Sequence, residues 1–214
     1  GVYDQNEYYV DFNTIYLQTQ PASVTHGIFF NSNTAVHYVR NNIVQVMSSS
    51  ATRTHSCIRY YNTPIGAERS VADHNVIYTE DPSSCYPIFV HMETDNYSDI
   101  TSWYNESGQD LNSYMTDPLL ISADDPHLQS GTVSDALEGG SYFAGALSWI
   151  VTDLDGDTRD ANSPDIGADE AVGIIALDIP IVEIDQADGS VLLEWIAVSG
   201  ATAYRIEASN EPET

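Results

Sequence analysis

Short apolar runs separated by turn-forming residues recur along the first part of the chain. One set of runs begins each time with an asparagine, at residues 13–16, 42–45 and 75–78. A second set carries an isoleucine at the same relative position, at Ile28, Ile58 and Ile88. Two strand positions that repeat with a period of about 30 residues predict stacked β coils, as in a β-solenoid. The runs are short, β-branched and broken by Asn, Gly and Pro, which disfavours helices.

Stacked coils assign a structural role to the repeated residues. Each coil pairs through backbone hydrogen bonds with its neighbours, and the aligned Ile and Val side chains stack inside. The aligned Asn13, Asn42 and Asn75 are expected to form a ladder at a turn, in which each amide satisfies its neighbour and buried backbone groups.

The pattern becomes irregular after residue 95. We expect short strands at residues 100–103 and 119–121, and turns at 124–126 and 139–140. Residues 141–151 are apolar and aromatic, and we expect them to cover the open end of the stack. Covering that edge would prevent pairing with another chain.

An acidic segment, residues 153–170, follows and carries seven acidic side chains against one base, Arg159. Gly156, Gly167 and Pro164 indicate tight turns. Two interpretations stay open. In the first, the segment binds calcium through the carboxylates of Asp153, Asp155, Asp157, Asp165 and Asp169. In the second, the Asp side chains cap backbone N–H groups and Arg159 pairs with neighbouring carboxylates.

The calcium interpretation rests on spacing. Asp153, Asp155 and Asp157 match positions 1, 3 and 5 of an EF-hand loop. However, Thr158 replaces the loop glycine and Pro164 replaces the final glutamate.

The acidic segment also carries a family resemblance. Its pattern D-x-D-G-D-x-R followed by D-I-G-A-D-E resembles the segment that closes many secreted bacterial right-handed parallel β-helix proteins, of the pectate-lyase-like kind. Three short motifs upstream also resemble the C-terminal part of these proteins, at residues 108–110, 117–119 and 127–129. The resemblance covers about residues 10–170 and implies an all-β, right-handed parallel β-helix with a terminal cap over residues 1–172.

Residues 173–214 follow a different pattern. Apolar residues alternate on both sides of Asp188-Gly189, which predicts a β-hairpin. This part resembles the first strands of a fibronectin type III domain, with Trp195 and Tyr204 as core aromatics. Such a sandwich needs about seven strands. We therefore expect a partial β-sandwich that continues beyond Thr214 or is completed by another chain.

Charge narrows the range of partners. The net charge is −26, from 32 acids, six arginines and no lysine. Such a chain does not neutralise phosphates, so we expect neither nucleic acid nor an anionic membrane surface as a partner. The sequence has no apolar run long enough to insert into a membrane.

Cysteines and histidines give weaker patterns. Cys57 and Cys85 fall on neighbouring coils with registers that differ by two residues. They form either a disulfide, which secretion would favour, or two buried thiols. The six histidines lack metal-ligand spacing, and we expect them at the surface or in turns: His26, His37, His55, His74, His91 and His127.

These patterns favour a secreted or cell-surface structural or adhesive protein that binds glycans, with no catalysis in this segment. The β-helix and fibronectin-like arrangement is similar to that of large bacterial surface proteins, including cargo of the type IX secretion system. Four aromatic residues are candidates for stacking on sugars, with core packing as the alternative: Tyr60, Tyr61, Trp103 and Tyr104.

Two other functions stay open. The chain is either the C-terminal part of a polysaccharide lyase or glycoside hydrolase, or the subunit of a self-associating extracellular filament. β-Helix lyases use a Lys or Arg base. This chain has no lysine, and we expect no carboxylate to align across coils with Arg40, Arg59 or Arg69.

Overall fold

The computed structural model describes residues 7–19, 24–31, 35–48, 55–61, 70–82, 85–90, 95–129, 132–143, 149–171, 182–187 and 190–195. Contacts divide the chain into two compact units, Gly1–Val172 and Gly173–Thr214. The protein is all-β with parallel sheets, and its one helix in the described ranges is short. None of the described helical residues forms a helix long and apolar enough to cross a membrane.

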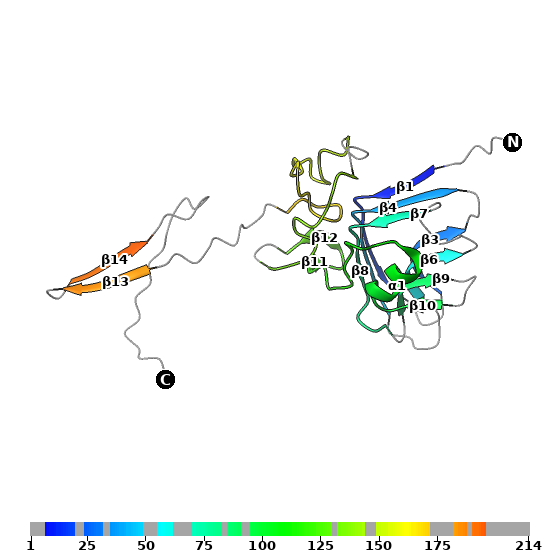
Figure 1. The fold of residues 1–214 in the computed structure, drawn as a ribbon, viewed down its shortest axis with the longest axis horizontal. Helices are drawn as coiled ribbons and strands as arrows, with labels where there is room; N and C mark the ends of the chain where they lie inside the picture. The colour runs from blue at the N-terminus through cyan, green and yellow to red at the C-terminus, as the bar shows by residue number, and fades with distance from the viewer. Residues whose placement is uncertain are drawn as a thin grey trace. The chain divides into compact units, whose positions relative to one another are not determined.

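Three parallel sheets build the first unit (Figure 1). The first contains β1 (Glu7–Asp11), β4 (Val36–Arg40) and β7 (Ser70–Asp73). The second contains β2 (Thr14–Gln18), β5 (Ile43–Met47) and β8 (Val76–Tyr78). The third contains β3 (His26–Asn31), β6 (His55–Tyr61) and β9 (Cys85–Val90). Each successive group of three strands therefore lies beside the group before it.

The strand registers confirm the predicted alignment. Ile28 pairs with Ile58, and Ile58 pairs with Ile88. In the second sheet Ile43 pairs with Thr14 on one side and with Val76 on the other. Since side chains alternate across a strand, this register places equivalent apolar residues on the same face in every repeat.

The sheet of β2, β5 and β8 is covered on both faces. Val44 and Val46 belong to the main core, whereas Ile43 belongs to a second apolar cluster with Leu120 and Ile166. Double coverage explains why β5 is apolar at nearly every position rather than alternating.

The asparagine ladder is confirmed. The Asn42 Oδ1 accepts from the backbone N–H and the amide of Asn13, at 3.0 and 2.9 Å. The Asn75 Oδ1 accepts from the same two groups of Asn42, at 3.0 and 3.1 Å. The Asn75 amide in turn donates to Val39 O and to the Asp110 carboxylate. The ladder thus runs from exposed Asn13 to buried Asp110.

A helix stands where the sequence predicted a strand at residues 100–103. This helix, α1 (Ile100–Ser107), follows the short strand β10 (Asp95–Tyr97), which pairs antiparallel with β9. Asp99 caps its first turn by accepting from Ser102 N, and Gly108 ends it in the left-handed conformation. These two capping residues outweighed the β-like composition, so the strand prediction was wrong.

Two antiparallel hairpins complete the described chain. The prediction at 119–121 is confirmed by β11 (Leu120–Ser122), which pairs with β12 (Asp125–Leu128). In the second unit β13 (Val182–Ala187) pairs with β14 (Ser190–Trp195), which confirms the predicted hairpin. Tyr204 and the third predicted strand lie outside the described residues.

Asn75→Ala should lower the free energy of unfolding by about 2–3 kcal/mol, because it removes the acceptor of the buried Asn42 N–H and the amide bonds to Val39 O and Asp110. Asn13→Ala is the matched control: Asn13 is exposed, so water replaces its contacts and the cost is small. Urea unfolding of both variants measures the difference, and equal losses would contradict a buried ladder.

Candidate functional site

Arg159 lies at the centre of the acidic segment and is only 4% exposed. Its Nη2 donates to Gly167 O and Ala168 O, both at 2.9 Å, and its Nη1 contacts the Glu170 carboxylate at 3.3 Å. Its guanidinium carbon lies 4.4 Å from the ring centroid of Phe12. The Arg159 side chain therefore binds the end of the acidic segment and also contacts Phe12 of the first coil.

Four aspartates of the segment accept from backbone N–H groups, and Asp169 does so from Leu128 N. Asp153 Oδ1 accepts from Asp155 N and Asp157 N, and its Oδ2 accepts from Glu170 N. Asp160 accepts from the N–H groups of residues 162 and 163. Asp165 accepts from those of residues 138 and 171. These bonds confirm the turn interpretation for Asp153, Asp160 and Asp165.

The acidic segment docks on the coils through backbone groups. Gly167 N donates to Asn41 O at 2.9 Å, and Ala168 N donates to the Thr14 hydroxyl at 2.9 Å. The Asn41 side chain accepts from Ser141 N and donates to Ser141 O. Gly167 has a φ of 106°, which allows this close approach.

Residues 141–151 were predicted to cover the end of the stack, and among the described residues only those at the start of this segment pack against the coils. The Tyr142 ring lies 6.0 Å from that of Phe12, and the Phe143 ring lies 5.0 Å from the Arg40 guanidinium carbon. Trp149 and Val151 are 72% and 52% exposed, so covering by these two residues was wrongly predicted. Residues 144–148 lie outside the described part.

A group of three side chains with the spacing of metal ligands lies where β12 meets the acidic segment. One ligand atom from each of His127, Asp155 and Asp169 lies within 4.8 Å of the others. His127 Nε2 is 2.7 Å from Asp155 Oδ2, and its Nδ1 is hydrogen-bonded to Asp125. The hydrogen bonds to Asp125 and then to Asp155 raise the pKa of His127 to about 9. The imidazole is thus held among carboxylates.

The structure places the five predicted metal ligands in different environments. Asp155 and Asp169 come together, whereas Asp153 and Asp165 accept from backbone N–H groups through both of their carboxylate oxygens. Asp157 is exposed and is not part of the group. Sequence reasoning missed His127, because its partner Asp155 is 28 residues away and no local motif links them.

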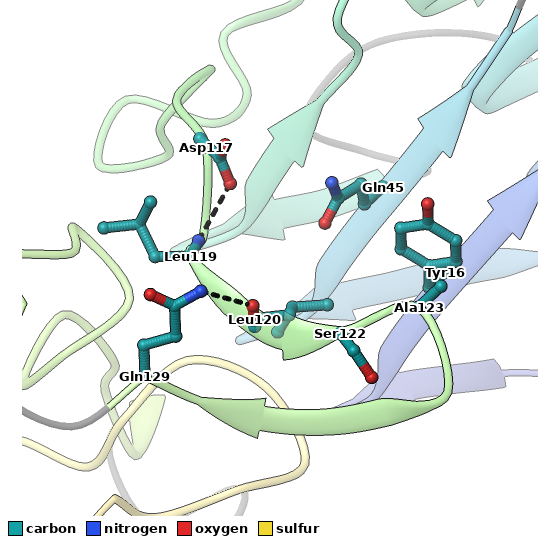
Figure 2. A pocket seen from close by; sticks show the side chains of 8 residues that line it. All are labelled: Tyr16, Gln45, Asp117, Leu119, Leu120, Ser122, Ala123 and Gln129. Atoms are coloured by element: carbon teal, nitrogen blue, oxygen red, sulfur yellow. Dashed lines mark hydrogen bonds between the residues drawn. The ribbon is translucent and has the colours of Figure 1, made fainter.

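A pocket of about 180 Å³ opens beside the outer face of the second sheet. In Figure 2, Tyr16 and Gln45 project from β2 and β5, and segment 117–129 supplies the remaining lining. That segment contributes the following residues: Asp117, Leu119, Leu120, Ser122, Ala123 and Gln129. The Gln45 Oε1 is buried and has no hydrogen-bond partner, which is unusual for a buried amide.

Two of the four aromatic candidates for sugar stacking lie in the core. Tyr60 and Trp103 are 1% and 0% exposed, and their rings stack at 5.6 Å. They cannot contact a glycan, so core packing was the correct alternative for both. Tyr61 is partly exposed beside Arg59, and Tyr104 is 37% exposed.

The coils align a carboxylate with Arg40, contrary to expectation. Asp11 pairs with Arg40 in register, and its two oxygens accept from Arg40 Nε and Nη2 at 3.0 and 2.9 Å. Both side chains are nearly inaccessible, at 3% and 2% exposure. The pair is a buried structural ion pair, which gives a substrate no access to the arginine.

Cys57 and Cys85 are both buried free thiols, which is the second of the two alternatives. Burial raises the pKa of Cys57 well above its ordinary value. The surface prediction was wrong for His37 and His55, which are 2% and 0% exposed. His91 lies outside the described residues.

No family model, curated protein or solved structure matches this sequence.

Gly167→Ala should destabilise the protein more than Gly156→Ala. Both glycines have positive φ, so each alanine costs about 1–2 kcal/mol of backbone strain. At Gly167 a Cβ would also lie 2.6 Å from Ile43 Cδ1 and 2.8 Å from Thr14 Oγ1, which adds about 1–3 kcal/mol. Gly156 faces open space. Thermal unfolding compares the two variants, and equal shifts would contradict close docking of the segment.

Asp165 should titrate well above Asp160. Burial raises the pKa of Asp165 from 3.8 to about 6, and the nearby Glu170 and Asp169 carboxylates add to the rise. Its folded pKa exceeds its unfolded pKa, so its contribution to stability is full below pH 3.8 and is lost as pH rises through 6. Backbone N–H groups lower the pKa of Asp160. Carbon-detected NMR titration measures both, and an Asp165 pKa below that of Asp160 would contradict the desolvation argument.

Proposed function

We propose that residues 7–171 form the last coils and closing cap of a right-handed parallel β-helix. Three observations support this proposal: the parallel registers, the asparagine ladder and the two-sided coverage of the second sheet. The antiparallel strand β10 and helix α1 follow the last coil, as expected where an open edge has to be blunted. The β13–β14 hairpin is then the start of a fibronectin type III-like sandwich.

Within this fold we propose a secreted or cell-surface structural protein that binds a saccharide, without cleaving it, in the pocket beside β2 and β5. The unpartnered, buried Gln45 Oε1 carries this proposal, because a ligand hydroxyl would supply the missing donor. The volume of about 180 Å³ suits one small polar ring rather than an extended apolar ligand.

The rest of the pocket lining has the chemistry of hydroxyl recognition. Tyr16 offers an aromatic face beside a polar rim. Asp117 keeps Oδ2 as an acceptor, since only its Oδ1 receives the Leu119 N–H at 2.9 Å. The Gln129 amide donates to Leu120 O, which holds its side chain beside the pocket. Amide, carboxylate and aromatic groups thus line one small volume, with the Asp117 and Gln129 side chains hydrogen-bonded to the backbone of Leu119 and Leu120 (Figure 2).

The number of carboxyl groups in the pocket favours binding of a saccharide without its cleavage. Glycoside hydrolysis ordinarily requires two carboxyl groups that flank the scissile bond. Among the residues that line this pocket, Asp117 is the only carboxylic acid. The site therefore suits retention of a glycan better than its hydrolysis.

Tyr16→Ala and Gln45→Met should each weaken glycan binding at least about tenfold, a loss of about 1.4 kcal/mol. A glycan array identifies a ligand for the full chain, and calorimetry then compares the variants. Tyr8→Ala is the matched control, because Tyr8 is an exposed tyrosine on β1 outside the pocket lining.

Three outcomes would overturn this proposal. The chain fails to bind any glycan, both pocket variants bind with unchanged affinity, or the bound saccharide is cleaved. The last result would favour the polysaccharide-degrading alternative. Unfolding curves for each variant separate loss of binding from loss of fold.

A further inference from the structure

We propose that His127, Asp155 and Asp169 bind a divalent transition-metal ion with the ligand preference of zinc. Three donor atoms from separate parts of the chain converge within 4.8 Å of one another. The set comprises one imidazole nitrogen and two carboxylate oxygens, which leaves a fourth tetrahedral position for water. This inference is independent of the saccharide pocket.

The imidazole ring is oriented for metal binding, and the ion would replace the proton that Nε2 shares with Asp155. Asp125 occupies the Nδ1 side of His127, so Nε2 faces Asp155. A carboxylate on the second ring nitrogen is the common arrangement around zinc-bound histidines, where it fixes the tautomer and the ring plane. Asp125 would therefore act as a positioning residue and not as a ligand.

Asp169 is a buried carboxylate with no arginine partner among the described residues. Its exposed fraction is only 5%, and the Leu128 N–H donates to its Oδ2 at 2.9 Å. In the part of the chain that the structure describes, no arginine forms an ion pair with this side chain. Burying a carboxylate is costly unless a cation compensates it. His127 already holds its two ring nitrogens against Asp125 and Asp155, so a divalent ion beside these groups would add the charge that Asp169 needs.

The donor set selects against calcium. Calcium takes six to eight oxygen ligands and seldom an imidazole, whereas zinc accepts nitrogen and oxygen together in fourfold coordination. Asp153 already accepts from three backbone N–H groups, which leaves at most one lone pair for an oxygen-rich calcium shell. The proposed ion joins β12 to the acidic segment and so links residues 28 positions or more apart.

The test is calorimetric titration of the full chain, first stripped with a chelator, with zinc chloride and separately with calcium chloride. We expect one zinc ion per chain and a higher thermal midpoint in its presence. His127→Gln and Asp169→Asn should each weaken zinc binding more than about tenfold, and Asp125→Asn by about tenfold. Asp157→Asn is the matched control, an exposed acid of the same segment outside the group.

Three results would overturn the proposal: no zinc binding, zinc binding unchanged by His127→Gln, or calcium binding that depends on Asp153 and Asp157 instead. The last result would favour the calcium site expected from spacing alone. His127 is 31% exposed at its side chain, so His127→Gln should fold even if Asp169→Asn does not. Loss of zinc binding in that variant, with glycan affinity kept, separates the two proposed sites.

Discussion

Satisfying buried polar groups from one coil to the next is the constraint on which the first unit depends. In stacked coils, the turns between strands bury backbone N–H and C=O groups, and each of these groups is costly if it has no hydrogen-bond partner. The ladder solves this problem by repetition, since each asparagine serves the backbone of the coil before it. Asp110 ends the series by accepting from Asn75, Ser113 and Trp103. The next step of the ladder is thus divided between two side chains, because Ser113 Oγ accepts from the Asn75 N–H and the Asp110 carboxyl group accepts from the Asn75 amide.

In the acidic segment, Arg159 satisfies buried backbone groups of the other kind: it donates to carbonyl groups, whereas the ladder asparagines accept from N–H groups. Its guanidinium donates to four backbone carbonyl groups, at residues 165, 167, 168 and 169. A lysine has the charge but not the planar fork that reaches so many acceptors. The surrounding aspartates then accept from the backbone N–H groups that the tight turns expose. The acidity of the segment is thus largely a consequence of its lack of regular hydrogen bonding.

The coils could be predicted from sequence because their contacts are periodic, as Ile28, Ile58 and Ile88 show. Helix α1 was predictable in principle, since Asp99 and Gly108 are ordinary capping residues, but its short apolar run resembled a strand. The cluster around His127 was not predictable in this way. Its members come from β12 and from two turns of the acidic segment, and only the docking of these parts brings them together.

The β11–β12 hairpin belongs to both proposed sites. Leu120 and Ser122 line the pocket, whereas His127 and Leu128 face the acidic segment. The hairpin is short, and Leu120 and Leu128 pack in the same apolar cluster as Ile43 of β5. A cation between His127 and Asp169 would fix one strand of this hairpin, and a saccharide against Gln45 would contact the other. The packing of Leu120 and Leu128 against Ile43 holds the hairpin in place without either ligand, so loss of one site should leave the residues of the other in position.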